Sequence, residues 1–81
     1  MNAPKTALIT GSTSGIGLGI ARAMRAEGAD VVLNGFGDEA EIAALCDELQ
    51  ARHINTDLTT VEGAETLMDE AGQVDILVNN A

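Results

Sequence analysis

The most constraining feature of the sequence is a glycine-rich turn that joins a short apolar run to an amphipathic segment. The apolar run is Ala7-Leu8-Ile9, and the turn that follows it reads Thr10-Gly11-Ser12-Thr13-Ser14-Gly15-Ile16-Gly17. A strand that passes through such a turn into a helix leaves the unpaired N–H groups of the helix N-terminus facing the turn. Those groups form a ready site for a phosphate. The turn therefore predicts a strand–loop–helix unit that binds an anionic ligand through its backbone.

Each glycine of the turn has a physical role in this interpretation. Gly11 permits the tight turn out of the strand, and Gly15 removes a side chain where a ligand approaches the backbone. Gly17 allows the helix to pack closely on the sheet. The alternative is a plain Gly/Ser-rich turn in which residues 12–14 act only as helix caps.

The rest of the chain alternates between strand-like and helix-like segments. A first strand is expected at residues 6–10, and further strands at Val31-Val32-Leu33, Ile76-Leu77-Val78 and, more weakly, His53-Ile54-Asn55. Continuous apolar runs are typical of strands covered on both faces, as in parallel sheets. Connections this short favour right-handed parallel crossovers. The order β-α-β-α-β-α-β therefore predicts a single doubly wound α/β unit.

Helices are expected at residues 15–27, 38–51 and 61–71. Their apolar stripes are predicted, in turn, as Ile16, Ile20 and Met24; Ile42, Leu45, Cys46 and Leu49; and Val61, Ala64, Met68 and Ala71. Asp38 followed by Glu41 resembles a capping box. Gly28 and Gly72 stand where helices commonly end. Cys46 is expected to be a buried structural thiol, and His53 a surface residue rather than a catalyst.

The charge balance limits the partners of the chain. Thirteen acidic residues against four basic ones give a formal net charge of −9. Such a chain repels a nucleic-acid backbone and an anionic membrane, so neither is expected as a partner. A single cysteine offers no disulfide or metal-spaced pair, and no metal site is expected. No signal peptide and no long apolar stretch is visible, which predicts a cytoplasmic protein.

The spacing of the glycines resembles the Thr-Gly-x-x-x-Gly-x-Gly motif of the short-chain dehydrogenase/reductase family. A second motif supports the resemblance, because Val74-Asp75-Ile76-Leu77-Val78-Asn79-Asn80-Ala81 is similar to the fourth strand of that family and its Asn-Asn-Ala ending. The resemblance covers essentially the whole chain. It implies the first half of a Rossmann-type doubly wound parallel sheet with strand order 3-2-1-4. Residues 1–81 would then be the NAD-binding portion, truncated after the fourth strand.

The resemblance implies a nicotinamide dinucleotide as partner and assigns residues to it. The phosphates and ribose would be lined by Gly11, Ser12, Ser14, Gly15, Ile16 and Gly17. Phe36 would meet the adenosine, Asp57 and Leu58 the adenine edge, and Asn80 and Ala81 the adenosine ribose. Asn79 is expected to tie the sheet together. Two alternatives stay open: Asp57 as part of a turn at the start of a helix, and the two asparagines as hydrogen-bonding residues of a strand end only.

The choice between NAD and NADP follows from charge. A 2′-phosphate calls for an Arg or Lys near the end of the second strand. Residues 34–39 contain no cation, and Asp38 and Glu39 would repel the phosphate, so NAD is expected. The acid usually found at the strand end is absent, and Asp38 as a helix cap alone stays open. The segment 32–37 also resembles bacterial D-3-hydroxybutyrate dehydrogenases, which implies oxidation of 3-hydroxybutyrate to acetoacetate.

The catalytic machinery of the family is a Tyr-x-x-x-Lys pair with a Ser and an Asn, all beyond the fourth strand. The sequence contains no Tyr. Without a phenolate no residue here is placed to accept the alcohol proton, so no catalytic residue is assigned and the 81 residues alone are expected to be inactive. The link from Leu49 to Asp57 is also shorter than the family pattern, which leaves the length of the third strand open.

Three functions are compatible with these observations. The first is a part of an NAD-dependent dehydrogenase that acts on an alcohol or ketone and forms a homo-oligomer at full length. The second is an autonomous, non-catalytic nucleotide-binding module. The third is a fragment that assembles through the fourth strand, Ile76-Leu77-Val78, because an exposed apolar edge strand recruits other strands.

Overall fold

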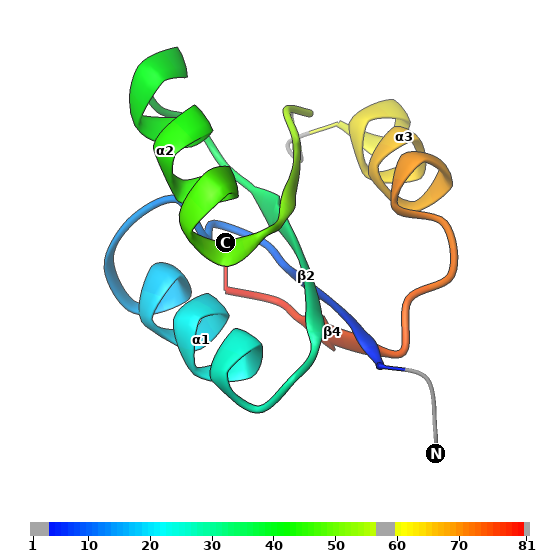
Figure 1. The fold of residues 1–81 in the computed structure, drawn as a ribbon. Coiled ribbons are helices and arrows are strands. Elements are labelled where there is room, and N and C mark those ends of the chain that lie inside the picture. Colours follow the sequence, from blue (N-terminus) through cyan, green and yellow to red (C-terminus); the bar gives the residue numbers. More distant parts are fainter. Residues whose placement is uncertain (1–3, 57–59, 81) are drawn as a thin grey trace.

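Four parallel strands alternate with three helices along the chain (Figure 1). The computed structural model describes residues 4–56 and 60–80. The elements are β1 (Thr6–Ile9), α1 (Gly15–Ala26), β2 (Asp30–Asn34), α2 (Glu39–Leu49), β3 (Arg52–Ile54), α3 (Val61–Ala71) and β4 (Ile76–Val78). Every pairing is parallel, and the strand order is β3-β2-β1-β4. The predicted α/β class and strand order are confirmed.

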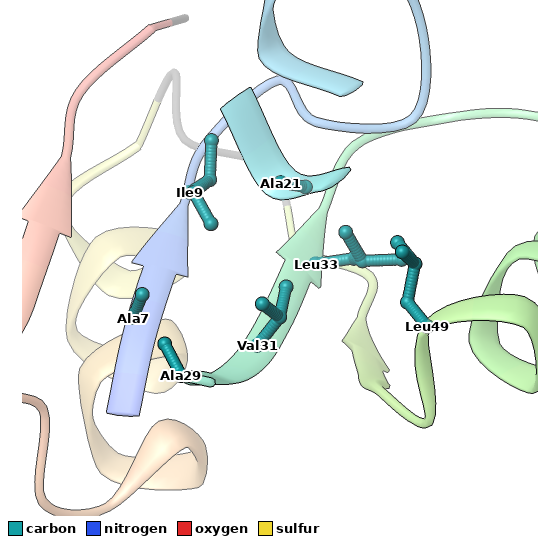
Figure 2. Close-up of a cluster of buried hydrophobic side chains, with 7 residues drawn as sticks. All are labelled: Ala7, Ile9, Ala21, Ala29, Val31, Leu33 and Leu49. Atoms are coloured by element: carbon teal, nitrogen blue, oxygen red, sulfur yellow. The ribbon is translucent and has the colours of Figure 1, made fainter. Parts of the chain in front are cut away.

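The helices cover both faces of the sheet, with α1 and α2 on one face and α3 on the other (Figure 1). Successive side chains of a strand point to opposite faces, so Ile9 packs on the α1 side while Leu8 packs on the α3 side. Figure 2 shows the larger cluster, formed by Ala7, Ile9, Ala21, Ala29, Val31, Leu33 and Leu49. The strand order reverses between β1 and β4. In open α/β sheets such a reversal creates a ligand crevice at the carboxyl ends of the strands.

The helix boundaries follow from capping residues. The Asp38 carboxylate accepts hydrogen bonds from the backbone N–H groups of Ala40 (3.1 Å) and Glu41 (3.3 Å), so α2 begins where the sequence predicts. Gly28 follows the end of α1 with a φ of 95°, and Gly72 ends α3 with a φ of 73°. The predicted positions of these glycines are confirmed.

The apolar stripes of two helices differ from the prediction. In α1, Ile20 and Met24 pack against the larger cluster as predicted, beside the buried Gly17 and Ala21, whereas Ile16 is 78% exposed. In α3, Leu67 and Ala71 face the sheet while Val61 and Met68 are exposed, so the predicted stripe was wrong except at Ala71. Glycine and alanine carry little hydrophobic signal. The small buried residues of α1 are therefore not marked by the apolar pattern. In α3 the adjacent Leu67 and Met68 are similarly apolar, and the packing on the sheet selects Leu67.

The predicted stripe of α2 is largely confirmed. Leu49 is buried, and Leu45 and Cys46 pack against the larger cluster. Cys46 is partly rather than fully buried, because α2 has only one face on the sheet. This partial burial raises the pKa of the Cys46 thiol.

The short third strand is accommodated by a left-handed residue. β3 begins one position earlier than expected, at Arg52, and pairs with β2 in the register Val32 to Arg52. Gln50 caps the C-terminus of α2 with a left-handed φ of 50° and ψ of 45°, at a position where a glycine is more usual. The Arg52 guanidinium donates hydrogen bonds to the carbonyls of Glu70 and Ala71 at the end of α3. The short link is thus sufficient for a strand.

β4 forms one edge of the sheet within the described residues. Leu77 is 55% exposed, while Ile76 and Val78 pack against the larger cluster. The expected apolar edge is therefore present. No helix within residues 4–56 and 60–80 is long and apolar enough to cross a membrane.

Candidate functional site

The loop from β1 to α1 holds an open helix N-terminus. Gly11 and Gly15 have φ angles of 61° and 59°, in the left-handed region that favours glycine. Ser14 is the N-cap residue of α1, and its side chain forms no capping hydrogen bond. A Cβ placed on Gly15 would meet no atom within 4 Å, and the first turn of α1 contains no acidic residue. The N–H groups and positive end of the helix dipole therefore remain accessible to an anion.

Gly17 allows α1 to approach its own loop. A Cβ at this position would overlap the Gly11 carbonyl oxygen and lie 2.6 Å from Asn80 Nδ2. The Asn80 amide in turn donates to the Gly11 carbonyl at 3.1 Å. The predicted close approach is confirmed, but its partner is the loop backbone and the end of β4 rather than the face of the sheet.

The ends of β1 and β4 are tied together by side chains. The Thr10 hydroxyl accepts a hydrogen bond from the Asn80 N–H (2.9 Å) and lies 3.3 Å from Asn79 Oδ1, to which it can donate. The Thr10 N–H also donates to the Val78 carbonyl at 3.0 Å. The expectation that Asn79 ties the sheet together is confirmed. Asn80 has the same role through both its backbone and its side chain.

Ser12 is turned toward β2. Its side chain is fully buried, and its hydroxyl accepts a hydrogen bond from the Asn34 N–H at 3.0 Å. Its own N–H donates to the Asn34 carbonyl at 2.7 Å. The hydroxyl therefore neither caps α1 nor faces the open side of the loop. Ser14, Gly15 and Ile16, in contrast, are exposed there.

Sequence reasoning gave no role to Asn34, which is buried at the end of β2. Its side-chain amide donates to the Ile54 carbonyl of β3 at 3.1 Å, and its backbone holds Ser12. A polar residue that ends an apolar strand was the available signal. Asn34 thus joins the glycine loop, β2 and β3.

The loop after β2 is hydrogen-bonded to the glycine loop and to β3. Thr13 Oγ1 donates to the Phe36 carbonyl at 2.7 Å, and His53 Nε2 lies 2.8 Å from the Gly35 carbonyl. His53 is therefore half-buried and hydrogen-bonded rather than a surface residue. The Phe36 side chain is 73% exposed. It lines, with Thr13 and Ser14, a cavity of about 380 Å³ between α1 and α2, so the structure brings Phe36 and the glycine loop together.

All four basic residues lie within the described ranges and away from the glycine loop. Lys5 precedes β1, at the opposite end of that strand. Arg22 Nε pairs with Glu48 Oε2 at 2.9 Å, which raises the pKa of Arg22 and lowers that of Glu48. Arg25 Nη1 lies 3.6 Å from Asp30 Oδ1, and Arg52 is bound to the end of α3. Any phosphate at the loop would therefore depend on backbone N–H groups.

Three predicted site residues, Asp57, Leu58 and Ala81, lie outside the described residues. The remaining ones gather at the carboxyl ends of β1, β2 and β4. The sequence model of the family described as short chain dehydrogenase matches residues 5–81. The chain belongs to the short-chain dehydrogenase family.

Curated relatives of this short-chain dehydrogenase chain include two proteins named D-beta-hydroxybutyrate dehydrogenase. The protein from Cupriavidus necator is 48% identical, with 95% of this chain and 33% of the relative covered. The protein from Rhizobium meliloti is 47% identical, with 95% and 34% covered. The resemblance to this group is confirmed. The chain spans about a third of the length of these relatives.

Solved structures of the family share the fold. A blue fluorescent protein from a metagenomic library, in complex with NADPH, superimposes with a TM-score of 0.87 at 34% identity, covering 95% of this chain and 36% of that one. Acetoin dehydrogenase from Enterobacter cloacae gives a TM-score of 0.83 at 36% identity, covering 100% and 36%.

Proposed function

We propose that this short-chain dehydrogenase chain binds NAD across the carboxyl ends of β1 and β4, as the dinucleotide-binding part of an oxidoreductase. The observation that carries the proposal is the open N-terminus of α1. Gly11 and Gly15 have left-handed backbones there, Ser14 forms no cap, and no acid stands in the first turn. The residues present fit a pyrophosphate held by N–H groups.

The other contacts follow from the surroundings of the loop. Ser14, Gly15 and Ile16 are exposed at the start of α1, and Gly17 brings the helix close to the Gly11 carbonyl. Phe36 shares a cavity with Ser14, which suits the adenosine half of the dinucleotide. Asp57, Leu58 and Ala81 stay predictions for the adenine edge and the ribose.

The distribution of charge supports NAD rather than NADP. Each Arg is bound elsewhere, and Lys5 lies at the opposite end of β1. The Asp38 carboxylate stands at the N-terminus of α2, close after Phe36, so a 2′-phosphate would meet an acid without a compensating cation. The solved neighbour with NADPH is a relative at 34% identity.

The chemistry of the whole protein is proposed from its relatives. A nicotinamide dinucleotide held at this site would supply the hydride acceptor for the oxidation of an alcohol. The described residues would bind and orient the dinucleotide, and with no Tyr in the sequence they offer no phenolate for the alcohol proton. The relatives named D-beta-hydroxybutyrate dehydrogenase favour 3-hydroxybutyrate as the substrate and acetoacetate as the product.

A second candidate function is assembly through β4. It is favoured by the exposure of Leu77 on an edge strand. An apolar edge of this kind pairs readily with another strand.

Titration of the purified chain with NAD and with NADP, by isothermal calorimetry, tests the proposal. We expect NAD to bind at least tenfold more tightly than NADP. Gly15→Val, which places a β-branched side chain at a φ of 59° beside the open N-terminus, should abolish binding. Gly19→Val is the matched control, because a Cβ at Gly19 also meets nothing within 4 Å but lies further along the helix. Absence of NAD binding by a folded chain that self-associates would favour the second candidate.

A further inference from the structure

Three consecutive backbone carbonyls, beginning at the last residue of β2, are each held by a group from a neighbouring segment. The Asn34 carbonyl accepts from the Ser12 N–H at 2.7 Å. The Gly35 carbonyl accepts from His53 at 2.8 Å, and the Phe36 carbonyl accepts from Thr13 at 2.7 Å. Donors from the glycine loop on one side and from β3 on the other thus fix the segment 34–36.

The hydrogen bond to the Gly35 carbonyl shows which ring nitrogen of His53 carries a hydrogen. A carbonyl oxygen only accepts hydrogen bonds, so Nε2 of His53 must carry a proton in this arrangement. His53 is the middle residue of β3 and is half-buried, with its backbone paired to Leu33 of β2. Its ring is therefore held in place by the sheet, which makes it a fixed donor.

The segment that His53 holds has little freedom to move toward the glycine loop. Gly35 has a φ of 150°, and a Cβ there would lie 2.7 Å from Thr13 Oγ1. Phe36 follows at once, with its ring exposed on the same cavity as Thr13 and Ser14. The bond from His53 restrains the Gly35 carbonyl from the side of β3, next to the bond from the Asn34 amide to the Ile54 carbonyl.

We propose that His53 is a positioning residue of the adenosine half of the dinucleotide site. It acts through the Gly35 carbonyl, which sets where Phe36 is presented, and it does not touch the ligand itself. The inference rests on the proposed binding of a dinucleotide. It adds a residue of β3 that sequence reasoning placed on the surface.

A purely structural role for His53 makes a different prediction. If the bond only stabilised β3, its loss would lower stability without changing the relative affinities for the parts of the ligand. If it positions Phe36, its loss weakens binding of AMP and NAD while inorganic pyrophosphate, which needs only the N-terminus of α1, binds as before. The ratio of AMP to pyrophosphate affinity therefore separates the two roles.

The experiment compares His53→Leu, which has no donor, with His53→Gln, whose amide nitrogen replaces Nε2. Arg52→Met is the matched structural control, because it removes the bonds to α3 from the adjacent residue of the same strand. Binding of NAD, AMP and pyrophosphate is measured by calorimetry at a temperature where every variant is folded. One hydrogen bond of this kind predicts AMP and NAD binding weaker by about 3- to 10-fold in His53→Leu. His53→Gln should recover most of the loss, and Arg52→Met should bind all three as the unchanged chain does.

Several outcomes would overturn the inference. They are unchanged AMP affinity in His53→Leu, an equal loss for pyrophosphate, or an equal loss in Arg52→Met. Thr13→Val, which removes the donor to the neighbouring Phe36 carbonyl, gives an independent test if His53→Leu does not fold, and it should show the same selective loss. If the unchanged chain binds neither NAD nor AMP, the proposed function itself fails. Normal binding with no effect of either substitution refutes only the role of His53.

Discussion

The N-termini of α1 and α2 lie on the same face of the sheet and border the same cavity, yet they are built in opposite ways. At α2, the Asp38 carboxylate accepts hydrogen bonds from two N–H groups, and Glu39 and Glu41 add negative charge to the first turn. At α1, Ser14 forms no side-chain cap and the first turn contains no acid. A carboxylate at a helix N-terminus stabilises the helix, but it occupies the groups that bind an anion.

At a helix N-terminus, stability and ligand binding use the same backbone N–H groups. α2 satisfies its N–H groups from within the chain, so its N-terminus serves the fold. α1 leaves them accessible and relies on the close approach of Gly17 to the loop, and on ties to β2 and β4, to keep its position. Changes that convert one type of N-terminus into the other should therefore separate folding from binding.

The largest effect is expected from Gly17→Ala. The new methyl group would overlap the Gly11 carbonyl oxygen, so α1 must shift away from its loop. We expect the free energy of unfolding in urea to fall by about 3 kcal/mol. Gly19→Ala is the control, since its Cβ meets nothing within 4 Å. It should raise stability by about 0.5–1 kcal/mol through helix propensity. Equal effects of the two substitutions would contradict the close approach seen at Gly17.

The next effect is expected from Ser14→Asp, which gives α1 the cap that α2 has. The carboxylate should raise the free energy of unfolding by about 0.5 kcal/mol while it repels a pyrophosphate. We expect NAD binding, measured by calorimetry, to weaken at least tenfold, or about 1.4 kcal/mol. Ser14→Asn keeps the shape without the charge and should lose much less affinity. Unchanged NAD binding by the Asp variant would show that the ligand does not use this N-terminus.

A smaller effect is expected from Asp38→Ala at α2. Two N–H groups lose their acceptor, so the free energy of unfolding should fall by about 1 kcal/mol. NAD affinity should change by less than about threefold, because the lost cap acts on α2 rather than on the N-terminus of α1. Asp38→Ser retains a capping oxygen and should keep most of the stability. If the free energy of NAD binding falls by more than the free energy of unfolding does, Asp38 belongs to the ligand site.

The smallest effect is expected at the exposed ion pair that joins α1 to α2. The hydrogen bond from Arg22 lowers the pKa of Glu48 below the ordinary glutamate value of 4.5, so the contribution of the pair to stability is fully present above about pH 4.5. This contribution to stability is lost as the pH falls below 4.5 and passes through the lowered pKa of Glu48 in the folded state. The stability difference between the unchanged chain and Glu48→Gln should therefore shrink below pH 4.5, as measured by urea denaturation. Glu65→Gln is the control, since Glu65 forms no ion pair within the described residues. A difference that does not depend on pH would exclude this pair as its source.

Much of the fold could be predicted from the sequence. The apolar runs and capping residues placed all seven elements, and the Asp38 cap and the two glycine ends were found where expected. The buried face of α1 was predicted at Ile20 and Met24 but not at Gly17 and Ala21, which add little hydrophobic signal. The buried face of α3 was predicted only at Ala71, because Leu67 and Met68 are adjacent and similarly apolar, and the pattern selected Met68. The strand order followed from the resemblance to a family rather than from the pattern itself.

The candidate site was predicted in part. The glycine turn and the contact of Asn79 with the end of β1 were predicted from sequence motifs. Gly15 lies beside open space, as a ligand that approaches the backbone requires. The inward direction of Ser12 and the bond from His53 to the Gly35 carbonyl were not foreseen. Both connect residues about twenty positions apart, on different strands and loops.

Local sequence alone sets where the backbone turns and where the helices begin, whereas the absence of a side-chain cap at Ser14 is visible only in the structure. Turns and helix starts depend on local residue types, such as glycines with left-handed φ angles and a serine at an N-cap position. The polar side chains that reach the loop after β2 are selected by the packing of the fold. Their partners are backbone carbonyls, which every residue carries, so no residue type marks them in advance. The register of β3 beside β2 selects the carbonyl of Gly35 as the one that His53 binds.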